Sequence, residues 1–310
     1  MAEVWWRLEM AAPAELEESL LWKLNQLGIQ RVAFRHRPEA PMDRQLLAWL
    51  PAVDWPATEH SRLEGALAPL AGTFGLELPP IRWIRQADED WSLSWKQHWQ
   101  PDPVGERLLI LPAWLELPPE HAHRLVIRMD PGSAFGTGSH PTTRLCLEAI
   151  ERMAQERADA GGHAPGLGGI RVADLGSGSG ILGIAALLQG AATVAATDTN
   201  SLAVRATRDN ARDSGFEDRL RVAHGSLEEL AGLLEHRPAD LLLCNILAPV
   251  IEALSPGFDR LLAPDGVGLL SGMLVSQAAG LETALARLGW RARLAAEQGS
   301  WGLMMLHKAH

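Results

Sequence analysis

The chain has 310 residues, 47% of them hydrophobic, which is enough for two domains with separate cores. Its formal net charge of −10 shows no basic footprint of the kind that nucleic-acid enzymes use on phosphates. With no apolar run near the ~18–20 residues of a membrane span, no signal-peptide pattern and only two isolated cysteines, we expect a cytoplasmic protein without direct nucleic-acid readout, membrane segment or cysteine metal site.

Residues 1–87 predict a small α/β unit. Its first helix starts near Pro13, and leucines then recur at spacings of four and three until Gly28. The expected order is β-α-β-β-α-β, which favours a ferredoxin-like split-βαβ module. The expected elements are strands at 5–10, 29–35, 45–50 and 81–85, with helices at 13–28 and 58–74.

A change of composition marks the next boundary. Residues 88–100 carry tryptophans at helical spacing (Trp91, Trp95 and Trp99) and predict a linker helix. From residue 101 to 310 the pattern is that of a longer α/β domain. A glycine-rich stretch at 161–169 predicts a surface insertion before the first buried strand of that domain.

A glycine-rich loop covers residues 130–140 and precedes a helix expected at 144–157. Pro141 suits a first helical turn, and Ser139 or His140 is the candidate cap. Glycines around Phe135 indicate a loop with an apolar tip that can cover a cofactor. The alternative is a long surface turn with an ordinary cap, in which His140 is structural.

A second glycine loop, Gly176–Gly180, lies between a short strand at 170–174 and a helix at 181–188. Such loops bring backbone N–H groups and a helix N-terminus close to a ligand, and a Cβ would block that approach. The next strand ends at Asp198, 22 residues after Gly176. A carboxylate at this point can accept the ribose hydroxyls of a nucleoside.

Two nucleoside cofactors compete for this loop. Residues 178–183 satisfy G-x-G-x-x-G, so an NAD-dependent oxidoreductase has to be considered. Asp174, directly before the loop, would repel a pyrophosphate, whereas S-adenosylmethionine (SAM) is positively charged at its sulfonium and ammonium. The residues therefore favour SAM, with NAD as the alternative.

A third strand, expected at 240–244, ends at Asn245. In doubly wound sheets the carboxyl ends of adjacent strands line the ligand crevice. An amide oxygen there can accept a hydrogen bond from an attacking amine and direct its lone pair. The alternative is a plain turn asparagine, which is common at strand ends.

Together these stretches resemble a known family. Residues 172–180 are similar to motif I of class I methyltransferases. That motif, with 130–143, 208–211 and 245–247, resembles the ribosomal protein L-eleven methyltransferase family (PrmA). The likeness is detailed over 88–310 and extends to 1–87 only in size and strand order.

The resemblance implies a class I methyltransferase domain, Rossmann-like with a seven-stranded mixed sheet, after a small N-terminal ferredoxin-like domain that docks the ribosomal protein. It implies SAM-dependent methylation of lysine side chains and an N-terminal amine. Asn245 is the expected orienting residue for the acceptor amine. The expected cofactor contacts are Thr143, Gly176, Gly178, Asp198 and Asn245, with Phe135 and His140 from the preceding loop.

Other functions stay open at this stage. A related methyltransferase with a different protein substrate would share the same catalytic domain. A module that binds SAM without catalysis would share the glycine loop. The eleven histidines form no H-E-x-x-H motif, so no metal is expected.

Overall fold

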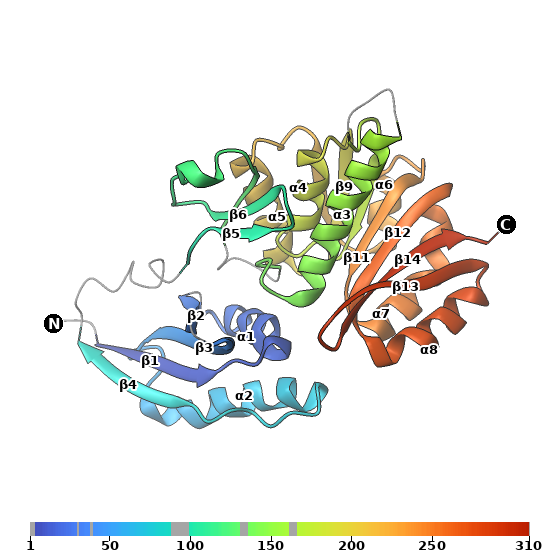
Figure 1. Ribbon diagram of the computed structural model, residues 1–310. Helices are drawn as coiled ribbons and strands as arrows, with labels where there is room; N and C mark the ends of the chain where they lie inside the picture. The colour runs from blue at the N-terminus through green and yellow to red at the C-terminus, as the bar shows by residue number, and fades with distance from the viewer. Residues whose placement is uncertain are drawn as a thin grey trace. The chain divides into compact units, whose positions relative to one another are not determined.

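The computed structural model describes residues 4–29, 31–37, 40–87, 99–130, 136–160 and 166–309 (Figure 1). Contacts between backbone positions divide the chain into two compact units. The first comprises residues 1–100 with 132–140, and the second comprises 101–131 with 141–310. In the described residues, the first unit has one sheet and one hydrophobic core cluster, and the second unit has two sheets and two core clusters.

The first unit contains the expected β-α-β-β-α-β order. Its four strands form an antiparallel sheet in the order β2-β3-β1-β4, the arrangement of a split-βαβ module. The ferredoxin-like prediction is confirmed. The elements are β1 (Val4–Ala11), α1 (Ala14–Gln26), β2 (Val32–Arg37), β3 (Ala40–Pro51), η1 (Ala57–Glu59), α2 (His60–Thr73) and β4 (Arg82–Ala87).

Helix α1 packs its leucine stripe onto this sheet. Leu16, Leu20 and Leu24 are fully buried, as the spacing predicts, and the helix ends where Gly28 takes a positive φ of 81°. Trp99, from the segment expected as a linker helix, donates to the carbonyl of Val32 at 3.4 Å. The rest of that expected helix, 88–98, lies outside the described residues.

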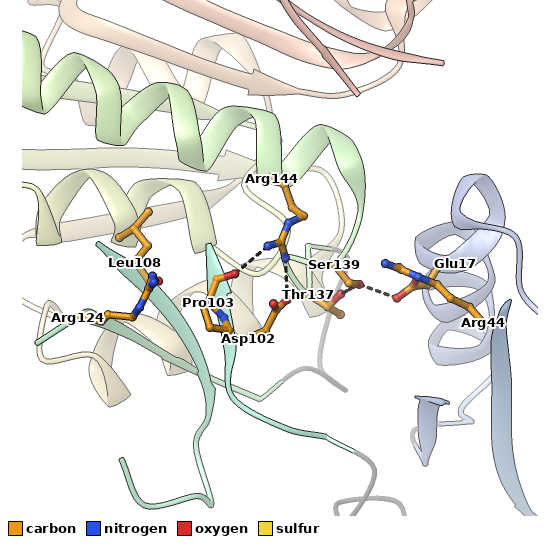
Figure 2. A network of polar contacts seen from close by, with 9 residues as sticks. All are labelled: Glu17, Arg44, Asp102, Pro103, Leu108, Arg124, Thr137, Ser139 and Arg144. Atoms are coloured by element: carbon orange, nitrogen blue, oxygen red, sulfur yellow. Dashed lines mark hydrogen bonds and ion pairs between the residues drawn. The ribbon is translucent and has the colours of Figure 1, made fainter. Parts of the chain in front are cut away.

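A buried acidic side chain interrupts the apolar face of α1. Glu17 is 1% exposed and forms an ion pair with Arg44 of β3. Its other carboxylate oxygen accepts a hydrogen bond from the hydroxyl of Ser139 at 2.6 Å, and Ser139 lies 2.8 Å from Thr137 (Figure 2). Residues 136–140 of the first glycine loop thus belong to the first unit.

We expect Arg44→Ala to destabilise the first unit, because it leaves the Glu17 carboxylate buried with only a hydroxyl partner. Breaking buried ion pairs costs about 3–5 kcal/mol. Arg44 is 21% exposed, so the loss should be nearer 2 kcal/mol. Urea unfolding measures it, with Arg82→Ala as the control, since Arg82 is 77% exposed in its pair with Glu9. Equal unfolding midpoints for the two variants would refute this assignment.

The second unit is built on a seven-stranded mixed sheet in the order β10-β9-β8-β11-β12-β14-β13, in which only β14 is reversed. This confirms the class I methyltransferase architecture. The elements are β8 (Arg171–Leu175), α4 (Ile181–Leu188), β9 (Thr193–Asp198), α5 (Ser201–Asp213), β10 (Leu220–His224), α6 (Leu227–Leu233), β11 (Ala239–Asn245), α7 (Ala248–Leu254), η4 (Ser255–Arg260), β12 (Leu262–Leu274), α8 (Val275–Ala286), β13 (Trp290–Gln298) and β14 (Trp301–Lys308).

Helices cover both faces of this sheet (Figure 1). Helices α4, α5 and α3 (Pro141–Asp159) contribute to one core cluster, and α6, α7 and α8 contribute to the other. The central strands β8 and β11 are buried at most positions and therefore read as apolar runs in the sequence, whereas the outer strands β10 and β13 are partly exposed. Pro141 is the first residue of α3, as its sequence position predicts.

A three-stranded sheet in the order β5-β6-β7 precedes α3, and its strands were not among the elements predicted from the sequence. Its strands are β5 (Asp102–Val104), β6 (Leu108–Pro112) and β7 (Leu125–Met129), with η3 (Pro119–His121) between the last two. Arg144 of α3 donates to the Asp102 carboxylate and to the Pro103 carbonyl, each at 2.8 Å (Figure 2). These bonds hold the first turn of α3, which also carries Thr143.

Within the described part of the chain, no helix is both long enough and apolar enough to cross a membrane.

Candidate active site

Three adjacent strands of the large sheet end at one edge. Strand β8 lies between β9 and β11, with Leu175 opposite Thr197 and Asp174 opposite Leu243. Because all three strands are parallel, the segments that follow them leave the sheet together. These segments are the glycine loop, the turn after Asp198 and the turn after Asn245.

The backbone N–H groups of the glycine loop donate hydrogen bonds to other atoms of the protein. An anion-binding loop needs backbone N–H groups that point at the ligand. Here four of them already donate internally, so the arrangement differs from a pyrophosphate cradle. The bonds are Gly176 N to Thr197 O at 2.9 Å, Ser177 N to Thr197 O at 3.0 Å, Gly178 N to Asp198 Oδ2 at 2.9 Å and Gly180 N to Ser177 O at 2.8 Å.

Asp198 lies half-buried at the end of β9 and holds the loop directly. Its Oδ2 accepts the Gly178 N–H, and its Oδ1 accepts the Asn200 N–H at 2.8 Å. An ionised carboxylate offers about four acceptor positions, so each oxygen keeps one for a further donor. Asp198 can therefore accept ligand hydroxyls while it orders the glycine loop.

The environment of Asp174 differs from the sequence prediction, which treated this residue as a charged carboxylate that repels a pyrophosphate. Its carboxyl group is 1% exposed and accepts the Gly183 N–H of α4 at 3.2 Å. Burial, and then the negative charge of Asp198, raise the pKa of Asp174 to about 7. Its ability to repel a pyrophosphate is therefore weaker than a fully ionised carboxylate would provide. The stronger argument against a dinucleotide is that the loop N–H groups already donate hydrogen bonds within the protein.

The raised pKa of Asp174 predicts a pH-dependent stability. Between the ordinary pKa of 3.8 and about 7, the unfolded chain loses this proton while the folded chain keeps it. The native state then binds more protons, so wild-type stability falls as pH rises through this window. We expect the thermal midpoint of D174N, relative to wild type, to rise by several degrees from pH 4.5 to 7.5. A constant difference between the two proteins would show that Asp174 is ionised in the fold.

Asn245 and Thr143 meet at the same edge. The Asn245 Nδ2 donates to the Thr143 Oγ1 at 3.2 Å. This bond fixes the amide, and its Oδ1 is buried and has no hydrogen-bond partner among the residues that the structure describes. A buried unpaired acceptor is costly, so its presence points to a donor that arrives with a ligand.

Two further predicted site residues, Phe135 and His140, come from the loop before α3. Phe135 lies outside the described residues. His140 belongs to the first unit, where it is buried. Burial, and then the nearby Arg44 cation, lower the pKa of His140 to about 4, so its imidazole is neutral at pH 7. The structure brings together Gly178 with Asp198 and Thr143 with Asn245.

Sequence reasoning noted residues 208–211 but gave them no role. Asn210 of α5 donates its Nδ2 to the Ser179 carbonyl at 2.9 Å and accepts the Asp130 N–H at 3.1 Å. One turn earlier, Thr207 donates to the Gly178 carbonyl at 3.0 Å. Two buried polar residues at i and i+3 on one helix face were the available signal. Their hydrogen bonds to two loop carbonyls hold the glycine loop in place.

Comparisons with known proteins identify the family of this chain. The family model described as "Ribosomal protein L11 methyltransferase (PrmA)" matches residues 4–309. The chain belongs to the PrmA family. A protein of Parasynechococcus marenigrum named ribosomal protein L11 methyltransferase is 62% identical over 300 residues, which cover 96% of this chain and 100% of that protein. One of the same name from Synechococcus elongatus is 41% identical, with 97% and 96% covered.

A solved PrmA structure is also similar. The crystal structure of a ribosomal protein L11 methylase from Lactobacillus delbrueckii subsp. bulgaricus has a TM-score of 0.58 and 32% identity. The match covers 68% of this chain and 100% of that chain. The family resemblance inferred from the motifs is therefore confirmed.

Proposed function

We propose that this chain transfers methyl groups from SAM to amino groups of ribosomal protein L11. The observation that carries the proposal is the Asn245 Oδ1, which is buried beside Thr143 and, within the described part of the chain, accepts no hydrogen bond. A neutral amine has the N–H that this oxygen lacks. The family and the names of the relatives supply the substrate.

The residues present fit SAM. Asp198 offers acceptor positions for the two ribose hydroxyls, and Gly176 and Gly178, both at positive φ, are proposed backbone contacts of the ligand. The half-buried Asp198 carboxylate suits a cofactor that is positively charged at two places. Thr143 and Asn245 complete the site, and Phe135 and His140 are proposed contacts from the loop before α3.

The chain's main contribution to catalysis is alignment. When bound, SAM would supply an electrophilic methyl carbon: the amine nitrogen would form the new N–C bond as the C–S bond broke, and the amine proton would leave to solvent. Asn245 orients the attacking nitrogen by accepting one of its N–H groups. A lysine has an ordinary pKa of about 10.4 and an α-amine about 7.7–8.0. Positive charge nearby lowers the pKa of either amine, so no strong base is needed.

The proposal also assigns the domains. Residues 1–87 would dock the ribosomal protein, 88–100 would connect, and 101–310 would bind SAM and carry out the transfer. Because the substrate is a ribosomal protein, the place of action would be the cytoplasm. A related methyltransferase with another protein substrate is the second candidate, since the fold alone does not define the acceptor.

Intact-mass spectrometry of L11 incubated with enzyme and SAM tests this function. We expect L11 to gain mass in whole methyl increments, and L11 with chemically blocked amines to gain none. A parallel incubation uses labelled SAM and the whole set of large-subunit proteins. Label on another band and none on L11 would support the second candidate, and no transfer to any protein would refute both.

A further inference from the structure

Ile246, directly after Asn245, lies between two glycines from different segments. Its half-buried side chain faces the glycine loop: a Cβ added at Gly176 would lie 2.6 Å from the Ile246 Cγ2. Real Cβ atoms do not approach that closely, so the γ2 methyl occupies the space that a side chain at position 176 would need. Gly176 also has a φ of +79°, which favours glycine.

The backbone of Ile246 is held from strand β12. A Cβ at Gly272 would lie 2.4 Å from the Ile246 carbonyl oxygen, 2.7 Å from its carbon and 2.8 Å from its nitrogen. Gly272 has a φ of +85° and sits where the pairing of β12 with β14 shifts register. The Ile246 N–H donates to the neighbouring Ser271 carbonyl at 3.1 Å.

These contacts connect two parts of the site. The glycine loop belongs to the cofactor side, and Asn245 belongs to the acceptor side. Its amide is fixed by Thr143 on one side, and its backbone continues into Ile246, which is packed against both glycines. The Ile246 side chain therefore lies between the glycine loop and the chain segment that carries the asparagine.

We infer that Ile246 is a positioning residue that sets the distance between the cofactor loop and the acceptor-orienting Asn245. The inference rests on the proposed function. A displacement of about 1 Å in such a site can lower the rate by about 100-fold. The γ2 methyl is the part of the side chain that carries this role.

Two substitutions separate this role from simple core filling. Ile246→Val keeps both branches at Cβ, including the γ2 methyl, and loses one terminal methyl. Ile246→Leu keeps the apolar volume and loses the β-branch. A spacing role predicts that I246V retains kcat within about twofold and that I246L loses about tenfold. If Ile246 only fills apolar volume, the kcat of I246L should be at least as high as that of I246V.

Three quantities are measured: the rate constant of methyl transfer to L11 in a single turnover, the SAM dissociation constant by calorimetry, and the thermal midpoint Tm. We expect I246L to lower kcat while its SAM Kd and Tm stay close to those of I246V. Equal kcat values for the two variants, or a kcat loss that tracks Tm, would overturn the inference. An inactive wild type would instead refute the proposed function, so the two failures are distinguishable.

Discussion

Asn245→Ala should lower kcat by about 10²–10³-fold and leave SAM affinity nearly unchanged. The substitution removes the unpaired Oδ1 that is proposed to orient the acceptor amine. Deletion of one preorganised hydrogen-bonding group in an active site costs rates of this order. Single-turnover methyl transfer to L11 measures kcat, and calorimetry measures SAM binding.

The matched control for this variant is Glu252→Ala. Glu252 is exposed on α7, the helix that begins three residues after Asn245, and its removal should leave kcat unchanged. An Asn245→Ala enzyme with wild-type kcat would remove the orienting role from the mechanism. A loss of kcat accompanied by an equal loss of SAM affinity would show that Asn245 acts through the cofactor.

Asp198→Ala should weaken SAM binding by about 100-fold. Two effects combine, because the variant loses the acceptor for the ribose hydroxyls and releases the Gly178 and Asn200 N–H groups. Hydrogen bonds to charged groups contribute about 1.5–3 kcal/mol each. At saturating SAM we expect a much smaller effect on kcat, since Asp198 does not face the acceptor amine in this proposal.

Asp209→Ala is the control for that experiment. Asp209 lies on α5 with its side chain 57% exposed, in a surface pair with Arg212. Its removal should leave SAM affinity within about twofold of wild type. If Asp198→Ala bound SAM as tightly as Asp209→Ala, the ribose assignment would be wrong.

The buried elements around the site were predictable from the sequence. Helix α4 begins and ends at the expected residues, 181 and 188, because an apolar run follows directly after a glycine loop. Asp198 and Asn245 were found because each ends a strand of buried residues. Local periodicity and turn chemistry were sufficient for these features.

Other features depend on contacts between distant segments. The short strand β5 contains Pro103 and lies next to Pro101, so local propensity did not indicate a strand. The Glu17–Ser139 hydrogen bond joins positions far apart in the chain. The close approach of Gly272 to the Ile246 backbone depends on strand register. The raised pKa of Asp174 required knowledge of its burial.

The central claim is that the edge formed by Gly176–Gly180 and Asp198 holds an adenosyl sulfonium and not a pyrophosphate. Calorimetric titration of the purified protein with SAM and with NAD, each also against Asp198→Ala, tests it most directly. We expect saturable binding of SAM that weakens in the variant, and no heat of binding from NAD. Saturable binding of NAD that depends on Asp198, with none for SAM, would contradict the account.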